Sequence, residues 1–352
     1  SEQSHNYFSL NDNMKKDIIK LIPVALVVIT LVCGCTTASE KNQRSATNTL
    51  TQTGLPQLSA ITGTGTLTPP ANPDNFSFVV FGDSQPNFTV VSQIFSQIKS
   101  GLKPTPDFGL SLGDIVKGEP QVPFDSDPIE KTLKNYLSHA KEAGVPIFNA
   151  PGNHELDDVV NTNPWTEMPS QKMQTLYEKV VGPTYGSFDF GNSHFIVLNT
   201  EDVPPKGMKG PKPPMEFSYI GSKQLAELQA DLDANRDKTH IFVAMHYPIH
   251  PRYPKRDSLY GESRQALIEL FAKYSNISYV LASHEHYFYN PFDEANVSTV
   301  PVFRAGGPTR YLISGGAGAP FWDPSQIWAF HHYLVFEVSG DIVNVTIKRL
   351  RE

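Results

Sequence analysis

Five short polar motifs, each directly after an apolar run, constrain this 352-residue chain more than any other feature. The apolar runs are short and rich in aromatic and β-branched side chains, which is typical of buried strands. In chain order the motifs are Gly82-Asp83-Ser84-Gln85, Gly113-Asp114, Gly152-Asn153-His154-Glu155, His246 and Ser283-His284-Glu285-His286. Ligand sites form where the strands of an α/β sheet end, so these side chains are expected to meet at one sheet edge.

Amphipathic helical patterns separate several of these runs. Apolar residues recur at helical spacing from Val90 to Ile98 and from Ile129 to Ala140. Ser222 is a candidate N-cap for a helix over 224–235, and residues 262–275 have a further helical pattern. Alternation of strands and helices predicts an α/β core.

The C-terminal part of the chain has a different pattern. Residues 311–314, 333–338 and 342–348 are predicted strands without helices between them. A second, largely antiparallel portion of sheet would accommodate these strands. We therefore expect residues 76–352 to form one α/β domain, a two-sheet sandwich flanked by helices.

The polar motifs supply a mixed set of candidate metal ligands. They are Asp83, Asp114, Asn153, His246, His284 and His286, with Gln85 as a seventh candidate. Imidazole combined with carboxylate and amide oxygens suits Zn, Fe, Mn or Ni better than Ca. Each motif alone is weak evidence, because a Gly-Asp pair is usually a turn and His-x-His at a strand end is more often packing. The order of all five motifs at strand ends makes the metal site the better interpretation.

Taken together, these motifs make the chain resemble a calcineurin-like metallophosphoesterase. That family's pattern is Asp-x-His, Gly-Asp-x-x-x-x-Gly, Gly-Asn-His-Glu or Gly-Asn-His-Asp, a single His, and Gly-His-x-His. The chain follows this pattern with two departures, Gln85 in place of His and Ser283 in place of Gly. The resemblance implies a four-layer fold in which helices flank two sheets.

The resemblance also implies two metal ions and a role for each matching residue. Asp114 would bridge the ions, Asp83 and His286 would hold the first, and Asn153, His246 and His284 would hold the second. The ions would activate a bridging hydroxide for attack on phosphorus. His154 would face the phosphoryl group and stabilise the transition state or protonate the leaving oxygen.

Gln85 makes the two implied metal positions unequal. An amide oxygen is a neutral and weaker ligand than imidazole for Zn or Fe. The first position is therefore expected to bind metal less tightly, to favour a harder ion such as Mn, or to take a water ligand. Purple acid phosphatases also lack this His, but they have a Tyr three residues after the bridging Asp. Lys117 occupies that position here, which argues against that subfamily.

The function expected from this resemblance is hydrolysis of small-molecule phosphate mono- or diesters outside the cytoplasm, as a phosphoric ester hydrolase. The alternative is a catalytically impaired, metal-binding surface lipoprotein that uses the same fold to bind a partner, with Gln85 as the sign of lost activity. Retention of His154 and of the second-position ligands favours the enzyme. The formal net charge of -7 argues against a nucleic-acid-binding module.

Residues 14–35 have the pattern of an export signal, with a basic start, a short apolar core and small residues behind it. Their end, Val32-Cys33-Gly34-Cys35, resembles a bacterial lipobox in which Cys35 would be lipidated; an uncleaved membrane anchor is the alternative. Residues 1–13 are expected to be upstream sequence. The Ser- and Thr-rich segment 36–75 is expected to be a flexible tether. These features predict a lipid-anchored enzyme of the bacterial cell envelope, on its periplasmic or surface face.

Other polar residues allow two interpretations. Glu155 and Asp157 either support the site from behind or cap the segment that follows. Arg310 and the glycines of 315–318 form either a loop near the site or an ordinary glycine-rich turn. His331 and His332 precede a predicted strand and are expected at the surface.

Overall fold

The computed structural model describes residues 57–350, apart from 86, 118–125, 160–166, 207, 209–217 and 255–258. The predicted upstream residues 1–13, the export signal 14–35 with Cys35, and tether residues 36–56 lie outside the described residues. Within the described part of the chain, no helix combines the length and apolar character that crossing a membrane requires.

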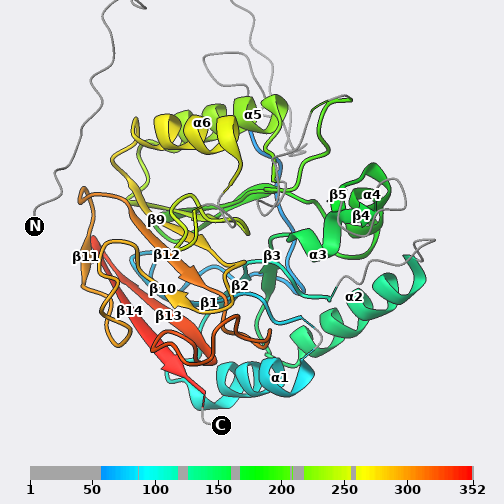
Figure 1. The fold of residues 1–352 in the computed structure, drawn as a ribbon. Helices are drawn as coiled ribbons and strands as arrows, with labels where there is room; N and C mark the ends of the chain where they lie inside the picture. Colours follow the sequence, from blue (N-terminus) through cyan, green and yellow to red (C-terminus); the bar gives the residue numbers. More distant parts are fainter. Residues whose placement is uncertain are drawn as a thin grey trace, which may run out of the picture. The chain divides into compact units, whose positions relative to one another are not determined.

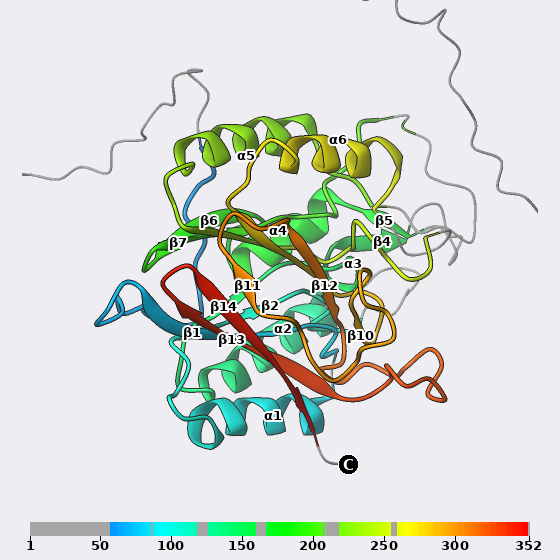
Figure 2. The same ribbon diagram turned by 90° about the vertical axis from the view of Figure 1, so that its left-hand side faces the viewer.

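Two mixed sheets of six strands face each other (Figures 1 and 2), which confirms the predicted fold class. The first sheet has the spatial order β11 (Phe303–Arg304), β14 (Ile342–Arg349), β13 (His332–Ser339), β1 (Asn75–Phe81), β2 (Phe108–Ser111), β3 (Ile147–Asn149). The second has the order β10 (Phe288–Tyr289), β12 (Arg310–Ser314), β9 (Ile277–Ala282), β8 (His240–Ala244), β7 (Ser193–Val197), β6 (Gly186–Phe190). A separate pair consists of β4 (Asp157–Val159) and β5 (Glu167–Pro169).

The strands that precede the polar motifs run parallel to their neighbours. In the first sheet β1, β2 and β3 are parallel, and β13 and β14 continue the sheet in antiparallel fashion. In the second sheet β7, β8, β9 and β12 are parallel. The prediction of an antiparallel tail is thus right for β13 and β14 and wrong for β12. Residues 283–309 connect β9 to β12 by a long crossover rather than a tight turn. The chain therefore enters β12 from the end at which β9 began, and the two strands pair in parallel.

Helices cover the outer face of each sheet. α1 (Phe88–Ser96), its π-helical extension η2 (Gln97–Gly101) and α2 (Ser126–Lys141) lie on the first sheet, and α5 (Ser222–Ala234) and α6 (Gly261–Phe271) lie on the second (Figure 2). α4 (Gln171–Val180) packs against α2 and α3 near the end of β3. The one-turn helix α3 (Asn153–Leu156) follows β3. This arrangement is the four-layer order that the resemblance implied.

Two predicted helix ends differ from the structure. Ser222 is already helical, and Gly221 occupies the N-cap with extended backbone, where its N–H donates to Asp202 Oδ2 at 2.7 Å. The predicted helix over 262–275 instead ends at Phe271. After this residue the α-helical hydrogen bonds give way to a turn, in which the N–H of Tyr274 donates to the carbonyl oxygen of Phe271, three residues earlier, at 3.1 Å.

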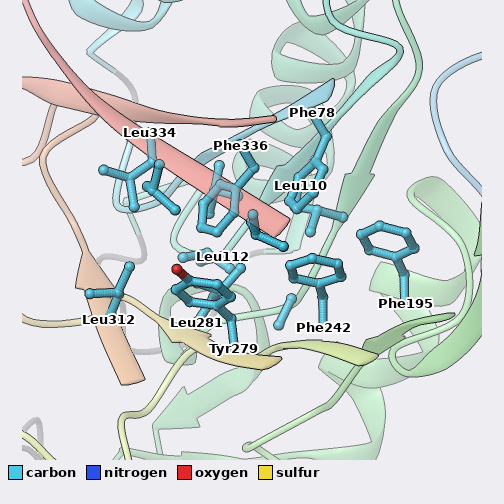
Figure 3. Close-up of a cluster of buried hydrophobic side chains, with 14 of the residues drawn as sticks. Phe78, Leu110, Leu112, Phe195, Phe242, Tyr279, Leu281, Leu312, Leu334 and Phe336 are labelled. Carbon is cyan, nitrogen blue, oxygen red and sulfur yellow. The ribbon is translucent and has the colours of Figure 1, made fainter. Parts of the chain in front are cut away.

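The core between the sheets is largely aromatic (Figure 3). The ring centroid of Phe78 in β1 lies 4.8 Å from that of Phe336 in the same sheet and 5.0 Å from that of Phe242 in the opposite sheet. Each buried ring of this size contributes about 1.5–3 kcal/mol of hydrophobic stabilisation. The packing therefore holds the two sheets together and brings the ends of β1, β2, β8 and β9 to a common region.

Residues 58–64, which the sequence placed in the flexible tether, pack against the sandwich. Leu58 and Ile61 are only 7% and 6% exposed. The Ile61 N–H donates to Ser187 O at 3.2 Å, and the Thr64 N–H donates to Ile147 O at 3.0 Å. Two apolar side chains three residues apart, together with backbone donors that meet strand edges, keep this segment in place. Leu58, Ile61 and Thr64 thus pack on the sandwich although they precede residue 76, where the sequence placed the start of the domain.

Candidate active site

Asp114 lies at the centre of the polar motifs that the strands bring together. Among the described residues, two groups have ligand atoms within 4.8 Å of one another: Asp114 with His246 and His284, and Asp83 with Asp114 and His286. All five residues are buried, and Asp114 belongs to both groups. The structure thus places the predicted ligands together, and the individual metal-binding roles stay predictions.

The site contains unusual backbone conformations. Among the described residues, positive φ in non-glycine residues occurs at Asp83 (57°), Gln85 (43°), Asp114 (51°) and His284 (69°). Such conformations cost of order 1–3 kcal/mol each and cluster at functional sites. Hydrogen bonds connect the turns: Asp83 N–H donates to Gly113 O at 3.1 Å, and Gln85 N–H donates to Asp114 O at 2.7 Å.

The Asp83 carboxyl group has the environment of a metal ligand. It is fully buried, and neither of its oxygens accepts a hydrogen bond. Burial, and then the nearby Asp114 carboxylate, raise the pKa of Asp83 well above its ordinary value. A buried carboxyl group without partners is strongly destabilising. A cation between Asp83 and Asp114 would relieve both the desolvation and the repulsion, so these residues fit a bound metal.

The Asp114 carboxylate accepts a hydrogen bond, whereas the nearest basic group to Asp83 is His246, with Nδ1 3.9 Å from Asp83 Oδ1. Asp114 Oδ1 lies 3.2 Å from His246 Nε2 and accepts a hydrogen bond of 3.2 Å from the backbone N–H of His154. Burial opposes ionisation, but His246 and His154 outweigh it and hold the pKa of Asp114 well below its usual range. Asp114 is therefore a preformed negative charge at the middle of the site.

Hydrogen bonds orient the His246 and His286 imidazoles for metal ligation. His246 Nδ1 lies 2.9 Å from Leu112 O and His286 Nδ1 lies 2.7 Å from Pro320 O, so each Nδ1 carries a proton and donates it. His246 Nε2 then faces the other candidate ligands, 3.0 Å from Asn153 Oδ1, 3.2 Å from Asp114 Oδ1 and 3.2 Å from His284 Nδ1. Backbone partners of this kind commonly fix the tautomer of metal-binding His residues.

Ser283, one of the two departures from the family pattern, takes part in the same network. Its Oγ donates to Leu112 O at 2.7 Å and lies 3.0 Å from His246 Nδ1. Gln85, the other departure, is 6% exposed and lies next to the site through its backbone bond to Asp114. Ligation by the Gln85 amide stays a prediction.

Glu155 supports the site from behind and also caps α3, so both interpretations hold for this residue. Its carboxylate accepts backbone hydrogen bonds from Asp114 and Val116, both at 2.9 Å, and from Gly152 at 2.7 Å. It therefore connects the turn after β2 to the turn that carries His154. A side chain at Gly152 would collide with Asp114 Oδ1, so the close approach of these turns requires glycine there.

His154 differs from its neighbours in exposure. Its side chain is 26% exposed, whereas that of Asp114 is 1% exposed. Its Nε2 lies 3.7 Å from Asp114 Oδ2. His154 is thus next to the candidate metal position and still accessible to a ligand that enters from solvent.

The glycine-rich turn lies next to the site, and His332 is buried rather than at the surface. A side chain at Gly315 would collide with Asp83 Oδ2, so this turn lies against the site. Arg310 points elsewhere and donates to Val302 O at 3.0 Å. The expectation of a surface position is wrong for His332, which is fully buried with Nε2 3.1 Å from Ser314 Oγ. His332 begins β13, where it packs inside the domain.

Comparison with known proteins identifies the same region of the chain. The model of the calcineurin-like phosphoesterase family matches residues 76–288. A probable inactive purple acid phosphatase from Arabidopsis thaliana is 27% identical over 191 residues, which cover 52% of this chain and 25% of that protein. The match thus spans only a quarter of that relative.

Two solved structures share the fold. A dimetal phosphatase from Danio rerio has a TM-score of 0.55 at 14% identity, with 78% of this chain and 96% of that chain covered. A purple acid phosphatase from yellow lupin (Lupinus luteus) seeds has a TM-score of 0.51 at 15% identity, with 79% and 52% covered. At these identities the similarity shows the fold alone.

Proposed function

Because the chain belongs to the calcineurin-like phosphoesterase family, we propose that it hydrolyses phosphate mono- or diesters with the help of two metal ions. The observation that carries this proposal is the buried Asp114 carboxylate shared by two ligand groups. A shared carboxylate is the ligand that a pair of mutually repelling cations requires. Mn, Fe, Zn and Ni all suit the mixed set of donors.

When bound, a pair of metal ions lowers the pKa of a coordinated water and stabilises negative charge on the phosphoryl oxygens. Asp83 and His286 would hold one ion with Asp114, and Asn153, His246 and His284 would hold the other. The bonds from Nδ1 of His246 to Leu112 O and from Nδ1 of His286 to Pro320 O leave Nε2 of each ring for the metal. Gln85 is the remaining candidate for the first position.

His154 is the proposed catalytic residue. Hydrolysis breaks the bond between phosphorus and the leaving oxygen, and that oxygen must gain a proton. The His154 ring is the partly exposed group next to Asp114, and its backbone N–H is held by Asp114 Oδ1 at 3.2 Å. From this position His154 would donate the proton to the leaving oxygen or stabilise the phosphoryl group, contributing about 10²–10⁴-fold to the rate.

The second candidate function is a metal-binding protein with impaired catalysis, and Gln85 is the observation that favours it. To separate the two, the protein is stripped of metal, reloaded with Mn, Zn, Fe or Ni, and assayed with an aryl phosphate and a bis-aryl phosphate. Turnover that depends on added metal and is lost in His154→Ala supports the enzyme. Bound metal without turnover in any reloaded form supports the impaired protein.

We also propose an exported, lipid-anchored location, which rests on the sequence pattern of residues 14–35. In a bacterial host the full chain is expected to incorporate labelled fatty acid, and Cys35→Ala is expected to abolish the label. Labelling that persists in Cys35→Ala would contradict the proposed attachment site.

A further inference from the structure

Aromatic side chains border the candidate metal ligands on one side. The Trp322 ring lies 5.3 Å from the His286 ring and 5.9 Å from the His284 ring. The Tyr287 and Tyr253 rings lie 6.3 and 6.4 Å from Trp322. The Trp322 indole thus stands beside two imidazoles that would hold the metals, and the two phenol rings extend this aromatic group from Trp322.

Part of this aromatic group is open to solvent. Trp322 is half-buried, and Tyr253 is 41% exposed although it is a large aromatic side chain. Tyr287, in contrast, is buried at 2% exposure and forms the floor under the other two rings. The surface available to a ligand therefore consists of the Trp322 and Tyr253 rings.

Hydrogen bonds attach both rings to the motif that carries the ligands. The His286 Nδ1–H donates to Pro320 O at 2.7 Å, two residues before Trp322. Glu285, which stands between His284 and His286, accepts from the backbone N–H of Tyr253 at 2.9 Å. Both segments are thus fixed relative to the metal ligands, and fixed recognition groups lose less entropy on binding.

We propose that Trp322 and Tyr253 form a subsite for a planar aromatic group, such as a phenyl ring or nucleobase, on the alcohol portion of the phosphoester. This inference rests on the proposed function. A phosphoryl group at the metal ligands would place its ester substituent within reach of both rings. Stacking on aromatic side chains is favourable for any flat π-system and tolerant of its identity. Aromatic substituents are therefore expected to be preferred about tenfold over non-planar ones of similar size.

The test compares 2-phenylethyl phosphate with 2-cyclohexylethyl phosphate, as monoesters and as methyl diesters. Both alcohols leave with similar intrinsic ease, so the ratio of kcat/KM reports recognition of the ring. We expect the wild type to favour the phenyl compound about tenfold. Trp322→Leu and Tyr253→Leu are expected to remove most of this preference through KM, with bound metal unchanged, and Trp322→Phe to retain part of it.

Trp328→Leu is the matched control, because Trp328 is also half-buried but stacks on Arg252, with 3.6 Å between the guanidinium carbon and the ring centroid. It is expected to leave the ratio unchanged. An unchanged ratio in Trp322→Leu would overturn the subsite. An equal decrease of kcat/KM for both substrates, together with loss of bound metal, would also overturn the subsite. Trp322 would then only hold His286 in position.

A binding arm separates this inference from the proposed function. Calorimetry with the two corresponding phosphonates on metal-loaded protein measures ring preference without turnover. If no phosphoester is hydrolysed but the phenyl phosphonate binds tenfold more tightly than the cyclohexyl phosphonate, the enzymatic function is contradicted and the subsite is supported. Equal dissociation constants for the two phosphonates would overturn the subsite whatever the activity.

Discussion

The contact between Gly82 and Ser283 makes the packing of the site testable by substitution. A methyl group added at Gly82 would lie 2.5 Å from Ser283 Cβ, 2.7 Å from its Oγ and 3.0 Å from Leu112 Cβ. Carbon atoms in ordinary contact are about 3.5–4.0 Å apart, so Gly82→Ala must push the ends of β1 and β9 apart by about 1 Å. Asp83 follows Gly82 directly, so the shift also displaces a candidate ligand.

Overpacking of a buried region destabilises a folded protein by about 1–3 kcal/mol. The atoms that the new methyl group meets first are next to the backbone and cannot swing away, so we expect a loss of about 2–3 kcal/mol from Gly82→Ala. Ser283→Gly removes two of these atoms but also loses the hydrogen bond to Leu112 O, worth about 1 kcal/mol. The double variant is expected to lose about 1–2 kcal/mol less than the sum of the single losses.

The assay is urea unfolding of the wild type, both single variants and the double variant, after treatment with chelator so that metal binding adds no stability. Gly65→Ala is the matched control, because the nearest atom to its added methyl group is Pro146 Cγ at 4.0 Å. It is expected to change the free energy of unfolding by less than about 0.5 kcal/mol. Additive losses from Gly82→Ala and Ser283→Gly would show that a side chain at residue 82 does not compete with Ser283 for space.

Three further predictions address catalysis, metal binding and pH. His154→Ala should lower turnover by about 10²-fold or more while metal analysis finds both ions retained; lost metal would show that His154 is a ligand. Gln85→His should raise metal occupancy of the first position in a Mn titration, and unchanged occupancy would place Gln85 outside the metal shell. Burial lowers the pKa of His194, but the hydrogen bonds that its ring donates to Asp189 Oδ1 at 2.6 Å and Asp231 Oδ2 at 2.8 Å outweigh burial, so the pKa of His194 is raised. The stability that protonated His194 contributes is complete below its unfolded pKa of about 6.5 and is lost as pH rises through the folded value. Chelator-treated His194→Gln should therefore lose more stability relative to wild type at acidic than at alkaline pH, and an equal loss at both would contradict the ion pairs.

The elements that build the site could be predicted because their signals are local. An apolar run followed by a polar break marks β1, β2, β3, β8 and β9, and each run was correctly predicted as a strand. The candidate ligands follow from the same breaks, since parallel strands end at a common edge. The structure accordingly places Asp83 and His286 near Asp114 although they are far apart in the sequence.

What the sequence missed depends on partners that are remote along the chain. Strands β6 and β7 were not predicted, because Asp189 and His194 interrupt the apolar pattern. The His194 ring bonds to Asp189 of β6 and to Asp231 of α5. The hydrogen bond of Ser283 could not be predicted from the sequence, since its acceptor, Leu112 O, lies 171 residues away. Burial of His332 depends likewise on its contact with Ser314, 18 residues earlier in the chain.

The segment at residues 58–64 crosses from one sheet to the other. It forms a bridge with Ser187 of β6 and another with Phe148 of β3, and these strands are the outermost members of their sheets on that side. Exposed edge strands offer unpaired backbone groups on which other chains can add and aggregate. One short stretch of chain thus protects two vulnerable edges at once. A shortened protein that starts at residue 76 would keep every candidate ligand and yet is expected to self-associate through β3 and β6.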